Sequence, residues 1–215
     1  MNIGITCRGC EARLSETKAH LGSHNVGVFW LNGINGRHSG LCTSHPYTAD
    51  DPSGKYRIPS GHVSLVVNHW FAWQIALMNL SSGDYAIFFE DDCRVVDGFN
   101  EYLDARMVEL EQLDPDWDFC YLGSLEGSTD LAHKGQCYEW TSGSIGKCKS
   151  DPYGTHCYAV SKKALPVLID KCERIYANID IAIWNEAIPH LRHYAFIPPL
   201  ANQKQDNETY QNTLG

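Results

Sequence analysis

Apolar runs of strand length alternate with segments of helical spacing along the 215 residues of the chain. The apolar runs that read as strands are 2–7, 26–31, 84–89, 118–122, 153–160 and 193–197. The segments with helical spacing between them are 11–21, 61–77, 99–113, 162–172 and 179–188. This alternation predicts an α/β fold with a mostly parallel central sheet, helices on both of its faces, and chemistry at the carboxyl ends of the strands.

The length predicts a single domain of residues 1–215, because a chain of 24.1 kDa buries about 70% of its unfolded surface in one core. Repeats and inter-domain linkers are absent from the sequence. Residues 37–60 have no period and are expected to form a binding loop or lid, and 135–149 are expected to form a hairpin or a loop. Residues 198–215 are polar and are expected to form a flexible C-terminal tail.

The charge balance argues against two classes of partner. With 17 Lys and Arg against 26 Asp and Glu the net charge is -9, and the basic residues form no stripe. Non-specific binding to nucleic acid or to an anionic membrane is therefore disfavoured. The sequence has no visible secretory signal, no run approaching about 18 apolar residues, and nine cysteines of the kind found as buried thiols. These features predict a cytoplasmic protein with no transmembrane segment and no obligate protein partner.

Three consecutive acids, Glu90, Asp91 and Asp92, directly follow the apolar strand 84–89. Neighbouring carboxylates repel one another, a cation relieves that repulsion, and hard oxygen ligands select Mg²⁺ or Mn²⁺. An ion held there could in turn bind a diphosphate. The competing interpretation is a solvated acidic turn that caps the next helix.

Three more side chains are candidates for the chemistry. Asp180 lies between apolar residues at the start of a helical stretch, where it could be a metal ligand, an anchor for an acceptor hydroxyl, a general base or a helix cap. His69 lies on a mostly apolar helix, which favours a hydrogen-bonded core histidine over a ligand. His156 lies in a strand that faces the expected site and is open to either interpretation.

Cys7 and Cys10 follow a strand and open a helix, as a thioredoxin-like redox pair does. The chain is about twice as long as such proteins, and a redox function leaves the acid cluster unexplained. Structural zinc would need further ligands, from Cys137 with Cys148 or from His190 with His193. Motifs of nucleotide triphosphatases, dinucleotide oxidoreductases and serine hydrolases are absent from the sequence.

Six features in order resemble glycosyltransferase family 25, the lipooligosaccharide and procollagen-type galactosyltransferases. They are the strand and Arg-bearing helix at 3–13, the Gly-ended strand at 30–36, the His and Trp of 68–73 with Asn68 in place of the usual Ser, the Glu-Asp-Asp at 90–92, the Leu-Gly strand at 117–123, and the segment 154–161 with the isolated Asp180. The closing Pro and Gln of the family resemble 198–203. The resemblance implies a GT-A type nucleotide-sugar-binding fold, a divalent metal and inversion at the anomeric carbon.

The resemblance also implies roles for individual residues. The implied binding residues for the donor are Thr6, Cys7, Arg8, Arg13, His69, Glu90, Asp91 and Gln203. The implied metal ligands are Asp92, Asp91 and His156. The implied catalytic residues are Asp180 as base, Glu186 as its reserve, and Asp91.

The sequence thus predicts a metal-dependent inverting hexosyltransferase that uses Mn²⁺ or Mg²⁺. The expected donor is a nucleotide diphosphate sugar, UDP-glucose or UDP-galactose, and the acceptor is a hydroxyl of a saccharide, a protein or a modified DNA base. The alternatives are a thiol redox protein that uses Cys7 and Cys10, and a catalytically inactive nucleotide-sugar-binding module on the same fold.

Overall fold

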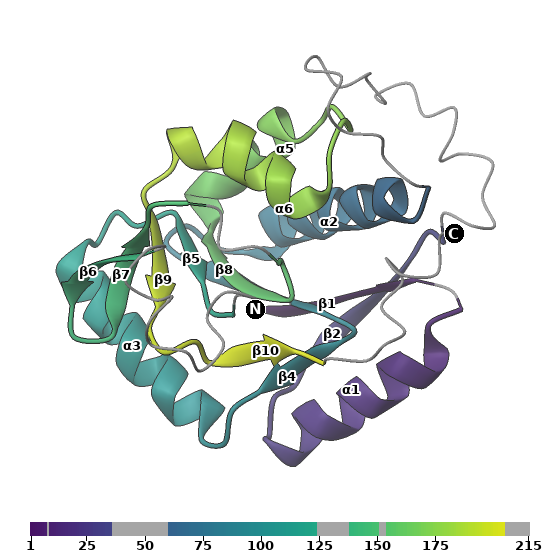
Figure 1. The fold of residues 1–215 in the computed structure, drawn as a ribbon, viewed down its shortest axis with the longest axis horizontal. Coiled ribbons are helices and arrows are strands. Elements are labelled where there is room, and N and C mark those ends of the chain that lie inside the picture. The colour runs from purple at the N-terminus through teal and green to yellow at the C-terminus, as the bar shows by residue number, and fades with distance from the viewer. Residues whose placement is uncertain (8, 36–59, 124–137, 151–153, 205–215) are drawn as a thin grey trace.

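A central sheet of eight strands organises the computed structural model, which describes residues 1–7, 9–35, 60–123, 138–150 and 154–204 (Figure 1). In spatial order the strands are β2 (Phe29–Gly33), β1 (Asn2–Cys7), β3 (Tyr85–Glu90), β8 (Cys157–Ser161), β5 (Phe119–Tyr121), β9 (His193–Phe196), β7 (Ile145–Cys148) and β6 (Tyr138–Ser142). Followed pair by pair, β8 and β7 run opposite to the other six strands. The sheet is therefore mostly parallel, as predicted.

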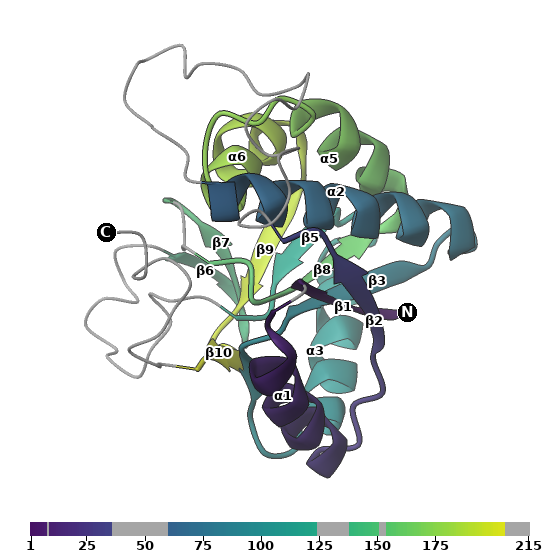
Figure 2. The ribbon, with the colours of Figure 1, turned by 90° about the vertical axis from the view of Figure 1, so that its right-hand side faces the viewer.

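Helices cover both faces of this sheet (Figure 2). One face carries α2 (Ser60–Asn79), α5 (Leu165–Lys171) and α6 (Ile179–Ala182), and the other carries α1 (Glu11–Ser23) and α3 (Phe99–Leu113). Strand β3 shows the reason: Ala86 and Phe88 join the core beneath α2, whereas Ile87 and Phe89 join the core beneath α3. A strand buried on both sides needs a continuous apolar run, and the sequence has one there.

Helix α2 is apolar around its whole circumference and has no charged residue in its 20 positions. It lies between the sheet and the pair α5 and α6, so two of its faces are buried (Figure 2). Ala72, Trp73 and Ala76 have no exposed surface. No helix in the described part of the chain combines the length and apolar character that a membrane span requires.

A second, two-stranded sheet lies beside the carboxyl end of β3. Strand β4 (Cys93–Val95) pairs antiparallel with β10 (Ala201–Gln203), which places Gln203 opposite Cys93. Strand β10 falls within the predicted flexible tail, so residues 201–203 form a strand where the sequence predicted none. Residues 205–215 of that tail lie outside the described residues.

The remaining differences concern element boundaries. The expected hairpin is present as β6 and β7. The strand predicted over 26–31 is β2 and begins three residues later, at Phe29, and the strand predicted over 153–160 is β8 and begins four residues later, at Cys157. Ser161 precedes a 3₁₀ turn, η2 (Lys162–Ala164), and makes no side-chain capping bond there. The last helical stretch is divided into α6, the π-helical turn η3 (Ile183–Ala187) and the 3₁₀ turn η4 (Ile188–His190). The expected binding loop lies, for 37–59, outside the described residues.

Candidate active site

A cavity opens where the parallel strands β1 and β3 end, beside the amino-terminal half of α2. It encloses about 630 Å³ of space, its open mouth included. Seven of the predicted site residues line it: Thr6, Cys7, Arg13, Glu90, Asp91, Asp92 and Gln203. Side chains far apart in the sequence meet here because neighbouring parallel strands end at the same edge of a sheet.

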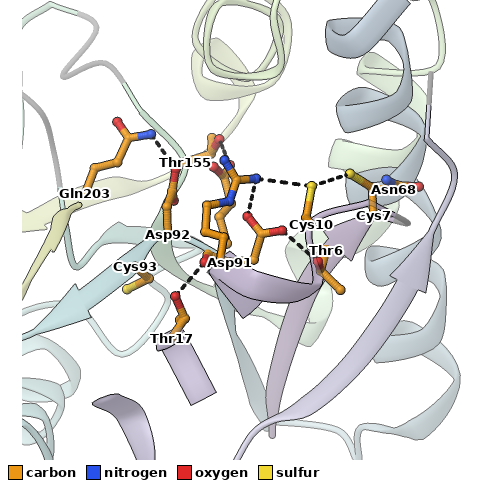
Figure 3. Close-up of polar contacts among 12 residues, drawn as sticks. Thr6, Cys7, Cys10, Thr17, Asn68, Asp91, Asp92, Cys93, Thr155 and Gln203 are labelled. Atoms are coloured by element: carbon orange, nitrogen blue, oxygen red, sulfur yellow. Dashed lines mark hydrogen bonds and ion pairs between the residues drawn. The ribbon is translucent and has the colours of Figure 1, made fainter. Parts of the chain in front are cut away.

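Asp91 is held by groups from β1 and α1 (Figure 3). Its Oδ2 accepts a hydrogen bond from Thr6 Oγ1 at 2.6 Å, and its Oδ1 forms an ion pair with Arg13 at 2.5 Å. The carbonyl oxygen of Asp91 accepts a hydrogen bond from Thr17 Oγ1 at 2.5 Å. Both carboxylate oxygens of Asp91 are therefore engaged by protein groups, which fits a positioning role better than the predicted role of metal ligand.

Asp92 lies next to Asp91 but has a different environment (Figure 3). Its Oδ2 accepts a hydrogen bond from Gln203 Nε2 at 2.7 Å, and its carbonyl oxygen accepts one from the amide of Lys204 at 2.8 Å. Its Oδ1 is buried, and none of the described residues hydrogen-bonds to it. A buried carboxylate oxygen without a donor is costly unless a ligand fills the place.

Glu90 ends a chain of buried polar groups. Its Oε1 is 3.1 Å from His69 Nε2 and accepts a hydrogen bond from Thr155 Oγ1 at 2.5 Å. His69 Nδ1 is 2.8 Å from the hydroxyl of Tyr158, which also accepts a hydrogen bond from Trp73 Nε1 at 2.8 Å. His69 is fully buried, and its two ring nitrogens lie against Tyr158 and Glu90, so within the described residues it positions Glu90. Its role in donor binding stays a prediction.

The three acids have different pKa values because their surroundings differ. Burial would raise the pKa of Glu90, but the hydrogen bonds from His69 and Thr155 outweigh it and lower that pKa. Burial raises the pKa of Asp91 to about 7, against the opposing effects of Arg13 and Thr6. Burial and the neighbouring Glu90 raise the pKa of Asp92 to about 6. Asp91 and Asp92 are 3% and 6% exposed, which overturns the interpretation as a solvated turn, and the cap of α3 is Gly98.

A divalent cation fits the unsatisfied Oδ1 of Asp92. Within the described residues, however, no group of three or more His, Cys, Asp or Glu side chains is arranged to hold a metal ion. The protein would therefore supply few of the ligands, and oxygens of a bound diphosphate and water would have to complete the coordination of a hard cation.

The other predicted residues lie at different distances from this centre. Asp180 accepts hydrogen bonds from the amides of Ile181 at 2.9 Å and Gly154 at 3.4 Å, and Gly154 precedes the Thr155 that binds Glu90. Asp180 therefore lies on a segment that borders the acid cluster. Glu186 lies in the π-helical turn η3 and accepts a hydrogen bond from Tyr176 at 2.5 Å.

His156 is fully buried beside the cluster, and its carbonyl oxygen accepts a hydrogen bond from the amide of Glu90 at 3.0 Å. Burial lowers the pKa of His156, against smaller opposing effects of Glu90 and the Ala201 carbonyl. A neutral imidazole is the form that a metal binds. Its ring lies against Gly123, where a Cβ would fall 2.4 Å from Nε2. Arg8 lies outside the described residues.

Cys7 and Cys10 lie at one rim of the cavity, with their Sγ atoms 2.9 Å apart (Figure 3). The redox interpretation expects a thiolate stabilised by the start of α1. Instead the hydrogen bond to Cys10 and burial raise the pKa of Cys7, and the negative charge of Asp91 adds to the rise. Cys7 is therefore a weak nucleophile, unlike the reactive cysteine of a thioredoxin-like protein.

Sequence analysis missed Asn68 as a structural part of this site. Asn68 Oδ1 accepts a hydrogen bond from the amide of Ile34 at 2.8 Å, and its Nδ2 donates one to the carbonyl of Ile34 at 3.1 Å. The amide side chain thus fixes the chain just after β2 and also lines the cavity. The position of Asn68 in an otherwise apolar helix could have indicated this role, because a buried side-chain amide requires hydrogen-bond partners.

The fold matches that of a known glycosyltransferase. The solved structure described as a glycosyltransferase involved in the glycosylation of the major capsid of PBCV-1 superposes with a TM-score of 0.54, at 11% sequence identity, over 98% of this chain and 94% of that chain. No protein-family model matches the sequence, and no curated protein matches it. The predicted α/β fold of glycosyltransferase type is thereby confirmed.

Proposed function

We propose that the chain is a metal-dependent inverting glycosyltransferase of the kind that its sequence resembles, glycosyltransferase family 25. It would move a hexose from a nucleotide diphosphate sugar, a UDP-hexose, to a hydroxyl acceptor. The observation that carries the proposal is the buried acid cluster that ends β3, in which Asp92 keeps an unsatisfied oxygen inside a cavity of a glycosyltransferase fold.

The residues that line the cavity would have different roles in the transfer reaction. Asp92 would hold a divalent cation, which supplies a Lewis acid to the diphosphate leaving group when it is bound. Arg13 and Thr6 hold Asp91, and they keep it oriented at the edge of the cavity. Thr6 and Cys7 end β1 and Arg13 lies in the first turn of α1, where the resemblance expects the donor nucleoside.

Inversion requires a base on the face opposite the leaving group. Asp180 is the proposed base, since it is partly exposed and is oriented by two backbone amides, that of Ile181 in its own helix and that of Gly154 beside Thr155. Its carboxylate would take the proton of the acceptor hydroxyl as the new glycosidic bond forms. Glu186 accepts a hydrogen bond from Tyr176 and is the second candidate for the base.

The acceptor is the least constrained part of the proposal. The protein in the solved structure is described as involved in the glycosylation of the major capsid of PBCV-1, and a protein hydroxyl is one of the acceptors considered. Saccharide hydroxyls and hydroxylated DNA bases are the others. The net charge of -9 counts against DNA.

The first experiment tests the donor, because donor binding can be measured without knowing the acceptor. Thermal unfolding of the purified chain is followed with nucleotide diphosphates and diphosphate sugars, each with Mn²⁺, with Mg²⁺ and with a chelator. A ligand at 100 times its dissociation constant adds about 2.7 kcal/mol to the free energy of unfolding. We expect stabilisation by a uridine diphosphate sugar only when metal is present, together with slow metal-dependent hydrolysis of that sugar.

Two Asp to Asn variants make the test specific. Asp92→Asn should abolish the metal-dependent stabilisation, whereas Asp104→Asn, at an exposed position on α3, should leave it unchanged. Stabilisation without hydrolysis in the wild type would support the inactive binding module instead. No stabilisation by any nucleotide with either metal would refute the proposal.

A further inference from the structure

The proposed transfer reaction gives the thiol pair at the rim of the cavity no chemical step, although Cys7 lies where the donor nucleoside is expected. Cys7 ends β1, lines the cavity and is partly exposed, whereas Cys10 is 4% exposed and directly precedes α1. Their sulfur atoms are 2.9 Å apart, about 0.9 Å more than a disulfide bond. Arg13 connects the pair to the acid cluster, since its Nη2 donates to Cys10 Sγ at 3.7 Å and pairs with Asp91.

We propose that Cys7 and Cys10 are a site of reversible disulfide formation by exchange with a low-molecular-weight disulfide such as oxidised glutathione. In the first step the Cys7 sulfur attacks the disulfide, forms a mixed disulfide and releases one glutathione thiol. In the second step the Cys10 sulfur displaces the second glutathione and closes the internal bond. The two protein thiols lose two electrons and two protons, and one oxidised glutathione becomes two reduced molecules.

The different exposure of the two thiols assigns these steps. A bulky disulfide can reach the partly exposed Cys7 from the cavity, but it cannot reach Cys10. Once the mixed disulfide has formed, the second thiol is already next to the sulfur it must attack, which gives it a high effective concentration. Proximity therefore accelerates the second step and makes the internal disulfide the stable product, whereas the weak nucleophilicity of Cys7 makes the first step the slow one.

A second pair of neighbouring cysteines provides the contrast within the same molecule. Cys93 and Cys157 also interact with each other, but both are fully buried beneath the acid cluster. A glutathione molecule has no access to either thiol while the protein is folded. The inference therefore predicts oxidation at one pair and protection at the other.

Disulfide formation would also affect the cavity. Closing the bond draws Cys10 Sγ toward Cys7, which alters its contact with Arg13 and thereby the partner of Asp91. This part of the inference rests on the proposed function, because it requires that a nucleotide sugar binds beside Arg13. Since coupling between two sites is reciprocal at equilibrium, a nucleotide whose binding is weakened by the disulfide should lower the oxidised fraction of the thiol pair.

The arrangement of arginines allows a direct test by mass spectrometry. The folded full-length chain is incubated with oxidised glutathione, remaining thiols are blocked, and trypsin then cuts after Arg8 and Arg13. We expect peptides 1–8 and 9–13 to be joined by a disulfide and to separate on reduction. Cys93 and Cys157 should become alkylated only after denaturation.

Single substitutions serve as matched controls. Cys10→Ser should leave Cys7 carrying one glutathione, and Cys7→Ser should leave Cys10 unmodified because it is buried. Recovery of both peptides unlinked from the wild type would overturn the inference. A disulfide from Cys7 to any other cysteine of the chain would also overturn it.

A parallel incubation with UDP and Mn²⁺ separates this inference from the proposed function. If the nucleotide stabilises the protein, we expect the ratio of linked to unlinked peptides, at equilibrium with a fixed ratio of oxidised to reduced glutathione, to be about tenfold lower in its presence. Stabilisation by the nucleotide together with unlinked peptides would refute the thiol inference alone. Linked peptides without any nucleotide binding would uphold the thiol site, although the proposed function would have failed.

Discussion

At the scale of single residues, the hydrogen bonds around Glu90 all point in one direction. The indole of Trp73 can only donate, so the oxygen of Tyr158 accepts its proton. The Tyr158 hydroxyl then donates to Nδ1 of His69, which leaves Nε2–H of His69 to donate to Glu90. Glu90 is thus held ionised in one orientation by groups that reach back into the core, with the orientation of each fixed by the next.

Removing the hydroxyl of Tyr158 should lower the free energy of unfolding. Tyr158→Phe leaves Trp73 Nε1 and His69 Nδ1 buried without their partner, and each such loss costs about 1–3 kcal/mol. We expect the free energy of unfolding, measured by urea denaturation, to fall by about 2–4 kcal/mol. Tyr102→Phe, at a half-exposed position on α3, should change it by less than about 0.5 kcal/mol. Equal effects of the two substitutions would contradict the chain of hydrogen bonds.

Residue chemistry was the most predictable part of the site. Glu90, Asp91 and Asp92 could be predicted as site residues, because three acids directly after an apolar strand are more than a helix cap needs. The sequence could not show that Asp91 is bound on both oxygens and Asp92 on only one. That difference depends on Thr6, Arg13 and Gln203, which come from elements distant in the sequence.

At the scale of elements, long periodic segments were predictable and short ones were not. The helix predicted over 99–113 has these bounds in the structure, because its apolar face repeats over four turns. Strands β4 and β10 have three residues each and were not predicted. Three residues carry no measurable period, and their pairing joins positions more than 100 residues apart. Gln203, which hydrogen-bonds to Asp92, was therefore attributed to a flexible tail.

The contact between α2 and the end of β2 gives a prediction about one element. Asn68→Ala removes both hydrogen bonds to the peptide of Ile34, so the chain after β2 should loosen at the edge of the cavity. We expect the amide of Ile34 to exchange with solvent at least about tenfold faster, and the protein to lose about 1–3 kcal/mol of stability. Asn79→Ala, at an exposed position on the same helix, is the control and should leave Ile34 protected. Unchanged exchange at Ile34 in Asn68→Ala would refute this role.

At the scale of the whole molecule, each helix must be attached to the face of the sheet that it covers. One such connection joins the end of α3 to β9: Asp114 accepts hydrogen bonds from Tyr194 at 2.8 Å and from Arg192 at 2.7 Å. Burial would raise the pKa of Asp114, but Tyr194, the amide of Asp116 and Arg192 outweigh it and lower that pKa. The ionised carboxylate of Asp114 therefore stabilises the fold.

The lowered pKa of Asp114 fixes the sign of a pH effect. A carboxylate whose pKa is lower in the folded state contributes stability above its unfolded pKa, about 3.9, and loses it as the pH falls through the folded value. Asp114→Asn should therefore be less stable than the wild type at pH 7, and the difference should shrink below about pH 4. Urea midpoints measured across this range test the effect, with Asp104→Asn as the exposed control. A difference independent of pH would assign the loss to packing instead.

Whereas ionised Asp114 stabilises the fold, the ionised carboxylates of Asp91 and Asp92 at the end of β3 destabilise it. Two adjacent buried carboxylates, one with an oxygen that none of the described residues hydrogen-bonds, lower the free energy of unfolding unless a ligand compensates for them. Asp92→Asn removes one charge, so in the presence of chelator we expect it to be more stable than the wild type by about 1–3 kcal/mol. Added Mn²⁺ and nucleotide should reverse the order, because only the wild type gains their binding energy. Thermal unfolding of both proteins in both conditions measures this reversal. If Asp92→Asn were less stable than the wild type in chelator, Asp92 would be a structural residue rather than a binding residue.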